Sequence, residues 1–307
     1  MIAGPTGVGK TATAVALARW VPMAVISADS RQVYRGLDAA TGKPSPAERA
    51  AVPHHLLDVV DPDERYQAAR FRADAAAAID AIRRQGRLPV VAGGTGLYIR
   101  ALLRGLDPAP PRDPELRREL EAIAATEGSA ALHARLVAVA PAAARALHPN
   151  DRVRVIRALE VRRAGHAPAP EQVRWRTRET AYTLCYVGLT RDRARLFEHL
   201  RARAATMAGP ALSREVETLL ARHGHEAELP AFKGIGYKEF VEVARGRVTR
   251  DEAVRRMQRD TVRYAKRQWT WFAREPEVRW LDVDEAGGPE GAADQIKKLL
   301  ESGGLIE

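Results

Sequence analysis

The first eleven residues contain a complete phosphate-binding motif. Residues 4–11 read GPTGVGKT and fit the pattern G-x-x-x-x-G-K-[ST] in full. Glycines in such a loop allow successive backbone N–H groups to converge on phosphate oxygens, and the following helix adds its positive N-terminus. The pattern predicts that Lys10 binds terminal phosphate oxygens and that the Thr11 hydroxyl binds Mg²⁺. ATP and GTP are the default ligands, although the chain lacks the N-K-x-D motif with which a GTPase reads its base.

Two further polar side chains follow expected strands at the same edge of a parallel sheet. Asp29 comes directly after the apolar run 23–28, and Thr95 comes directly after the run 88–94. Asp29 is a candidate general base that could take a proton from an amine or hydroxyl beside the bound phosphate. It could equally cap a turn or hold Mg²⁺. Thr95 could cap the helix that follows it, or direct its hydroxyl into the same crevice as Asp29.

The charge balance points to an anionic partner. Lys and Arg number 49 against 39 Asp and Glu, a net charge of +10, which favours nucleic acid. Residues 151–163 and 255–272 concentrate this charge. In the second segment the basic residues recur at helical spacing, and a different face can pack inward, through Val254, Met257, Thr261, Ala265, Gln268 and Phe272. The outward stripe comprises Arg255, Arg259, Arg263, Lys266 and Arg267, and the alternative is an ordinary solvated helix face.

The elements that must position these groups alternate between strand and helix. Strands are expected at 23–28 and 88–94, with helices at 10–20, at 66–85 and directly after Thr95. This order is typical of a doubly wound α/β domain with ligands at the carboxyl ends of its strands. Only three residues precede the phosphate-binding loop, whereas strands usually have about five. We therefore expect either missing upstream residues or a clipped central strand.

The second half of the chain changes character after a proline-rich stretch. Residues 113–172 are expected to form an all-helical insertion, which divides an α/β core of residues 1–112 and 173–307. The core resumes with a strand at 182–189, helices at 191–208, 211–223 and 249–273, a strand at 278–283 and a helix at 289–302. With no run of 18 apolar residues and no export signal, we expect no membrane association and a cytoplasmic location.

Seven stretches in sequence order resemble the bacterial tRNA dimethylallyltransferase (tRNA isopentenyltransferase) family. They are GPTGVGKT, SADSRQVYRGLDAATGKP, HHLLDVVDP, VAGGTGLYIRALL, DRVRVIRALEV, FKGIGYKEF and YAKRQWTWF. The resemblance implies a P-loop α/β core with a helical insertion. It implies transfer of a dimethylallyl group from dimethylallyl diphosphate to the exocyclic amine of adenosine 37 in tRNA, with Mg²⁺ as cofactor and the anticodon stem-loop as partner. We expect a monomer.

The resemblance also implies roles for individual residues. Asp29 is similar to the general base of the family, and Thr95 to the threonine that positions the target amine. The expected donor-binding residues are Gly4, Thr6, Gly7, Val8, Gly9, Lys10, Thr11 and Arg203, with Thr11 near the metal. The expected tRNA-binding residues are Asp29, Ser30, Arg31, Gln32, Thr95, Arg117, Arg152, Val153, Arg154, Val155, Lys233, Gly234, Ile235, Gly236, Tyr237, Lys238, Arg259, Arg263, Lys266, Arg267 and Gln268.

Two features depart from the pattern of the family. Lys233 stands where an arginine is commoner, which weakens the case for that contact, and the C-terminal zinc finger of eukaryotic members is absent. Two rival functions make different predictions. A P-loop small-molecule kinase would need a nucleotide-base pocket and an arginine lid, and would ignore tRNA. A non-catalytic RNA-binding switch would function without Asp29.

Overall fold

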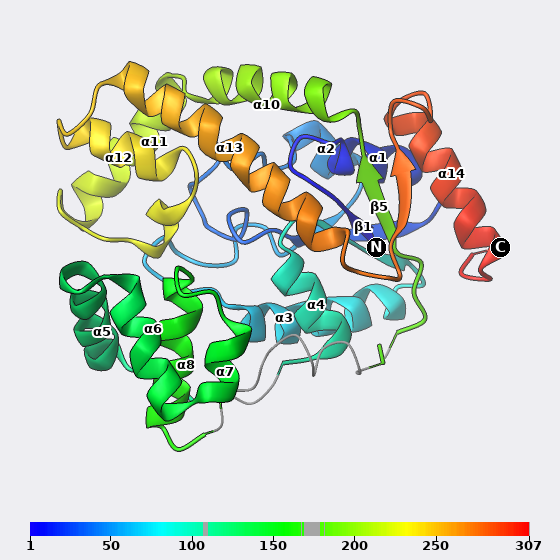
Figure 1. Cartoon of the computed structure of the whole chain (residues 1–307). Helices are drawn as coiled ribbons and strands as arrows, with labels where there is room; N and C mark the ends of the chain where they lie inside the picture. Colours follow the sequence, from blue (N-terminus) through cyan, green and yellow to red (C-terminus); the bar gives the residue numbers. More distant parts are fainter. Residues whose placement is uncertain (107–109, 167, 169–178, 181, 307) are drawn as a thin grey trace. The chain divides into compact units, whose positions relative to one another are not determined.

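The computed structural model describes residues 1–106, 110–166, 168, 179–180 and 182–306 (Figure 1). The chain divides into two compact units. One comprises Met1–Leu103 and Tyr182–Glu307, and the other comprises Arg104–Ala181. The second unit contains the whole of the expected insertion and extends beyond it at both ends.

The first unit is built on a parallel sheet of six strands in the order β3-β2-β4-β1-β5-β6. The strands are β1 (Ile2–Ala3), β2 (Met23–Ala28), β3 (His54–His55), β4 (Leu88–Gly93), β5 (Val187–Thr190) and β6 (Arg279–Asp282). Although β1 has only two residues, both are buried, and Ile2 pairs with Ala92 on one side and Val187 on the other. The phosphate-binding loop therefore starts from the centre of the sheet.

Helices cover both faces of this sheet (Figure 1). The first unit contains the helices α1 (Lys10–Leu17), α2 (Pro46–Ala51), α3 (Ala68–Arg84), α4 (Gly96–Arg104), α10 (Arg193–Met207), α11 (Pro210–His223), α12 (Tyr237–Ala244), α13 (Arg250–Phe272) and α14 (Pro289–Ser302), with a short 3-10 helix at Pro230–Lys233. Successive strand residues point to opposite faces. Val25 accordingly packs in one core with α1 and α14, and Ile26 packs in another with α3 and α4.

The second unit is helical throughout its described part. Its helices are α5 (Pro114–Thr126), α6 (Gly128–Val139), α7 (Pro141–Ala146) and α8 (Arg152–Arg163). Asp113 and Asp151 accept backbone N–H groups at the starts of α5 and α8, as N-cap residues do. Leu132, Leu136 and Val155 form the centre of a core that belongs to this unit alone.

Two sequence expectations need correction. The strand expected at 182–189 is confined to Val187–Thr190, because the parallel ladder starts only where Val187 lies opposite Ile2 and Arg279. The first helix ends at Leu17 and not at Trp20, since the next residues form tight turns back to Ala16 and Leu17. The strand at 23–28 and the terminal helix at 289–302 are confirmed to the residue.

Candidate active site

The phosphate-binding loop has the backbone conformation that its glycines allow. Gly4, Gly7 and Gly9 have φ angles of 143°, 75° and 109°. A side chain at Gly4 would also strike the backbone carbonyl of Leu189 in β5. Only glycine accommodates both constraints, so the loop is held closely against the strand beside it.

Lys10 folds back into its own loop. Its ammonium donates hydrogen bonds to the carbonyls of Gly4 (3.0 Å) and Pro5 (2.8 Å). Burial lowers the pKa of Lys10 to about 8, while the nearby Asp29 carboxylate acts in the opposite direction and Arg203 lowers it further. Lys10, Asp29 and Arg203 therefore share one electrostatic environment.

Arg203 extends from α10 into this environment and is half-buried. Burial lowers its pKa, and the Asp29 carboxylate raises it. Among the described residues, none forms a salt bridge or hydrogen bond with its guanidinium. A cation removed from water without a partner is costly, and an anion is the partner that would offset this cost. Arg203 and Lys10, beside the N–H groups of the loop, form a site suited to a diphosphate.

Asp29 directs its two carboxylate oxygens to different tasks. Oδ1 accepts the backbone N–H groups of Arg31 (2.8 Å) and Gln32 (3.3 Å), which closes a turn at the end of β2. No described residue donates to Oδ2. The turn-capping interpretation and the general-base interpretation are therefore compatible, because each needs a different oxygen.

Thr95 links the ends of two neighbouring strands. Its hydroxyl accepts the backbone N–H of Ser30 (3.0 Å), directly after Asp29, instead of an N–H group of its own helix. Tyr264 of α13 lies near Asp29 and Thr95, and both affect its pKa. Burial and the Asp29 charge raise the pKa of Tyr264 to about 12, so its hydroxyl stays protonated at neutral pH. Thr95 thus lies against the turn that carries Asp29.

Gln268 of α13 joins the phosphate-binding loop to the end of β4. Its Oε1 accepts the N–H of Thr6 (2.8 Å), and its Nε2 donates to the carbonyl of Gly94 (2.8 Å). The side chain is only 4% exposed. The expected inward position of Gln268 is confirmed. Its amide bonds the loop and the end of β4 from this buried position, and the expected tRNA contact stays a prediction.

Comparison with known proteins identifies the chain. The IPP transferase family model matches residues 32–275, and the isopentenyl transferase model matches residues 1–59. A tRNA dimethylallyltransferase of Anaeromyxobacter dehalogenans is 49% identical over 298 residues, which cover 97% of this chain and 98% of the relative. The chain belongs to the tRNA dimethylallyltransferase family.

Solved structures of this family of enzymes share the fold. The tRNA isopentenylpyrophosphate transferase of Bacillus halodurans is 38% identical with a TM-score of 0.70, over 99% of this chain and 96% of that chain. A eukaryotic dimethylallyltransferase acting on tRNA is 29% identical with a TM-score of 0.72, over 92% of this chain and 72% of that chain. The expected P-loop-like α/β fold is confirmed.

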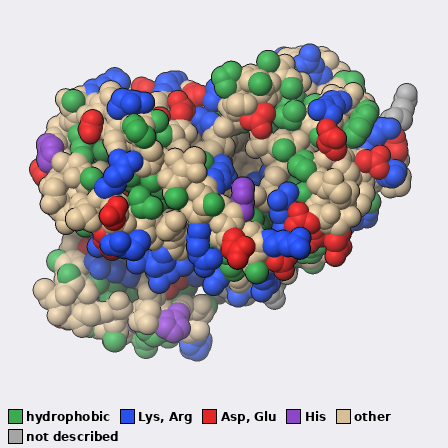
Figure 2. All heavy atoms as spheres, turned by 90° about the horizontal axis from the view of Figure 1, so that it is seen from above, with side chains coloured by type: hydrophobic (Ala, Val, Ile, Leu, Met, Phe, Trp, Pro, Cys, Tyr) green, Lys and Arg blue, Asp and Glu red, His purple; other side chains and the backbone are tan. Residues whose placement is uncertain are grey.

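The dimethylallyltransferase resemblance assigned the outer face of α13 to tRNA, and this face is exposed. Figure 2 views the molecule from the side on which α10 and α13 lie in Figure 1, and Lys and Arg side chains are numerous there. Glu252 pairs with Arg255 (3.0 Å), and Asp260 pairs with Arg259 (3.2 Å) and more loosely with Arg263 (3.7 Å). The stripe is therefore better balanced by acids than its sequence suggested. Lys266 and Arg267 lie over the rings of Phe197 and Tyr264.

The segment 233–238 presents its two lysines and buries most of the rest. Lys233 and Lys238 are exposed, Ile235 is half-buried, and Gly234 and Gly236 are buried. The expected tRNA contact by the Tyr237 side chain is wrong, because that side chain is fully buried and donates to Glu215 (2.5 Å).

In the turn after Asp29, some of the expected tRNA-binding side chains form hydrogen bonds within the protein. Ser30 and Arg31 are half-exposed, and Arg31 reaches the carbonyl of Pro230 (3.3 Å). The amide of Gln32 instead bonds the Ser27 hydroxyl (2.8 Å) and the carbonyl of Gly42 (2.9 Å). A direct tRNA contact by the Gln32 amide is therefore not available in this conformation.

In the second unit, the start of α8 presents Val153 and Arg154 to solvent, with Val153 70% exposed. Val155 is completely buried, so its expected tRNA contact is wrong for the side chain. Arg152 donates to the carbonyl of Glu121 (2.7 Å).

Arg117 of α5 holds Glu160 of α8 through two hydrogen bonds (3.0 and 2.7 Å), and the Glu160 carboxylate is buried. Arg117 therefore fixes the packing of α5 against α8. Its neighbour Arg118 is the exposed arginine of the two, so the expected tRNA contact fits Arg118 better.

Thr11 is the candidate metal-binding residue. It lies half-exposed in the first turn of α1. Among the described residues, no group of three or more His, Cys, Asp or Glu could hold a metal ion. Mg²⁺ commonly keeps several waters and takes its other ligands from substrate phosphates, so one hydroxyl beside a diphosphate site fits this ion.

No helix in the described part of the chain is long and apolar enough to cross a membrane.

Proposed function

We propose that the protein transfers a dimethylallyl group from dimethylallyl diphosphate to the exocyclic amine of adenosine 37 in the tRNA anticodon stem-loop, which gives N6-isopentenyladenosine. One observation carries the proposal. The half-buried guanidinium of Arg203 lies in one environment with Lys10 and Asp29, and within the described part of the chain neither this guanidinium nor Oδ2 of Asp29 has a hydrogen-bond partner. The names of the relatives, which describe dimethylallyl transfer to tRNA, support it.

The donor side of the site stabilises the leaving group. As the bond between the allylic carbon and the diphosphate oxygen breaks, its electron pair passes to the diphosphate. Lys10, Arg203 and the loop N–H groups are positioned to offset that charge. Thr11 would hold Mg²⁺, which neutralises further diphosphate charge when bound.

The acceptor side activates a weak nucleophile. The adenine amine attacks the allylic carbon, and Oδ2 of Asp29 accepts a proton as the new carbon–nitrogen bond forms. Thr95 holds the turn that carries Asp29. The adenine must leave the base stack to reach this carboxylate, at a cost of a few kcal/mol. Contacts between tRNA phosphates and the exposed stripe of α13 would offset that cost.

A transfer assay tests the proposal. Purified protein is mixed with radiolabelled dimethylallyl diphosphate, Mg²⁺ and unmodified tRNA, and we expect label on a single adenosine of the tRNA. A parallel reaction with labelled ATP and no tRNA tests the P-loop kinase alternative. Label that never enters tRNA would falsify the proposed reaction, and phosphoryl transfer in the parallel reaction would favour the kinase. The monomeric state and the cytoplasmic location stay predictions.

A further inference from the structure

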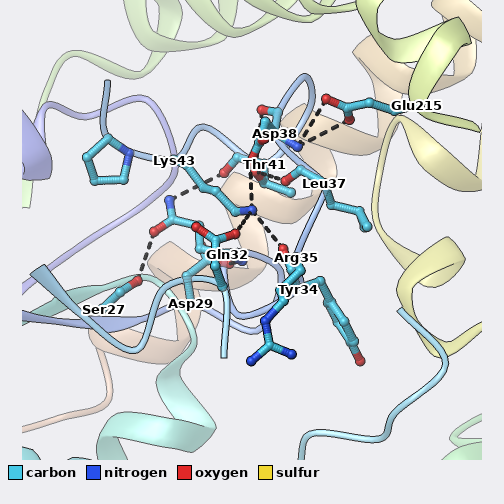
Figure 3. A network of polar contacts seen from close by, with 12 residues as sticks. Ser27, Asp29, Gln32, Tyr34, Arg35, Leu37, Asp38, Thr41, Lys43 and Glu215 are labelled. Atoms are coloured by element: carbon cyan, nitrogen blue, oxygen red, sulfur yellow. Dashed lines mark hydrogen bonds and ion pairs between the residues drawn. The ribbon is translucent and has the colours of Figure 1, made fainter. Parts of the chain in front are cut away.

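A buried lysine fixes the loop that follows the Asp29 turn. Lys43 has a side chain only 3% exposed. Its ammonium donates to the carbonyl of Tyr34 (2.7 Å) and to the carboxylate of Asp38 (2.7 Å) (Figure 3). It also donates to the carboxylate of Asp58. A buried ammonium with three acceptors is well satisfied, so the loop of residues 32–43, which we call the Lys43 loop, is held at its base.

Further hydrogen bonds hold the two ends and the middle of the Lys43 loop. The amide of Gln32 accepts from the Ser27 hydroxyl and donates to the carbonyl of Gly42. The carboxylate of Glu215 accepts the backbone N–H group of Asp38 (3.1 Å) (Figure 3) and that of Ala39 (3.0 Å). The backbone of Gly42 is therefore fixed relative to the turn that contains Asp29.

The Arg203 guanidinium packs directly on this fixed backbone. Gly42 has a φ of 62°, and a Cβ there would strike Nη2 of Arg203 and contact Met207 (3.8 Å). Gly36, in the same loop, has a similar φ of 70°, but a Cβ there would meet nothing within 4 Å. The two glycines thus share a backbone conformation, and only Gly42 supports the arginine.

We infer that the Lys43 loop is the positioning element for Arg203, with the bare backbone of Gly42 as the surface that orients the guanidinium. This inference rests on the donor-binding role proposed for Arg203. A carboxylate partner would also orient the arginine, but it would compete with the diphosphate for the same charge. Packing against uncharged backbone orients the cation and leaves its charge available.

Paired glycine variants test the inference. Gly42→Ala and Gly36→Ala introduce the same left-handed alanine and the same kind of backbone strain. We expect Gly42→Ala to raise the KM for dimethylallyl diphosphate by about tenfold or more and to leave the KM for tRNA unchanged, whereas Gly36→Ala changes both by less than about twofold. Calorimetric binding of inorganic pyrophosphate provides a second readout of the donor site.

A double variant shows whether Gly42 acts through Arg203. Arg203→Ala should raise the donor KM by itself, and adding Gly42→Ala to it should have no further effect. Equal behaviour of the two glycine variants, or an undiminished effect of Gly42→Ala in the Arg203→Ala protein, would overturn the inference and leave the proposed reaction standing. An unchanged donor KM in Arg203→Ala would instead overturn the donor role of Arg203 together with the inference.

Discussion

At the scale of single residues, the site depends on groups held in states that water would not favour. The ammonium of Lys10 lies within its own loop, and the guanidinium of Arg203 has no carboxylate partner among the described residues. Both favour an anion, and the lowered pKa of Lys10 also ties its contribution to pH.

The Lys10 pKa predicts how diphosphate binding depends on pH. Below pH 8 Lys10 is protonated in both the free and the bound protein, so its titration does not make the affinity for diphosphate depend on pH. A bound diphosphate favours the charged form, so above pH 8 binding must take up a proton and weakens by up to about tenfold per pH unit. Calorimetry with inorganic pyrophosphate across this range measures the effect. Lys10→Arg, which stays charged, should lose the dependence assigned to Lys10, and an identical profile in that variant would contradict the assignment.

Asp29→Asn separates the two tasks of this carboxylate. Asparagine keeps an oxygen for the N–H groups of Arg31 and Gln32 but is not a base. We therefore expect turnover to fall by about 10²–10⁴-fold with tRNA affinity retained. Single-turnover transfer and filter binding measure the two quantities. Asp63→Asn, which changes an exposed carboxylate, is the control. If Asp29→Asn lost tRNA binding as strongly as turnover, Asp29 would be a structural residue.

At the scale of elements, α13 joins two functions on its two faces. Its outer face carries exposed arginines, and its inner face brings Gln268 to the phosphate-binding loop and to the end of β4. Variants on opposite faces of this one helix should therefore affect the binding of different substrates, tRNA for the outer face and the donor for the inner face.

Arg259→Glu combined with Arg263→Glu tests the outer face. We expect weaker tRNA binding and a smaller salt dependence, because fewer counterions are released from the phosphates. The KM for the donor should not change. Lys297→Glu with Lys298→Glu, the same charge reversal on α14, is the control. An unchanged salt slope in the α13 variant would reduce the stripe to a solvated face.

Gln268→Met tests the inner face. Methionine fills a similar volume but cannot bond Thr6 or Gly94, so we expect a higher donor KM with unchanged tRNA affinity and salt slope. Steady-state kinetics and filter binding separate these effects. A change in tRNA affinity alone would indicate a direct contact between Gln268 and tRNA, which the burial of this residue argues against.

The sequence predicts this helix and its inner face because burial follows a helical period that can be read locally. It does not reveal which inner residue meets the loop, since Gln268 and Thr6 are 262 positions apart and only the fold brings them together. Asp29 and Thr95 were predictable because both follow apolar strands. Lys43 was not, because a lysine is normally exposed and its three acceptors converge only after folding.

At the scale of the whole molecule, the chain has two units with separate cores. Leu132 is fully buried in the core of the second unit and contributes nothing to the first. Leu132→Ala should destabilise the second unit by about 2–5 kcal/mol. Hydrogen exchange of the α6 amides reports this loss, and pyrophosphate affinity should stay unchanged. The exposed Val153→Ala is the control, and a weakened pyrophosphate site in Leu132→Ala would show that the units are not independent.

The two cations of the proposed donor site have a consequence for the catalytic cycle. In the proposed reaction Lys10 and Arg203 bind the diphosphate group and not the carbon chain attached to it, so we expect the released diphosphate to fit the site as well as the incoming donor does. It should therefore be a competitive product inhibitor, and its departure should limit turnover once chemistry is fast. An enzyme that hydrolyses inorganic diphosphate would then accelerate modification without touching this protein or its tRNA.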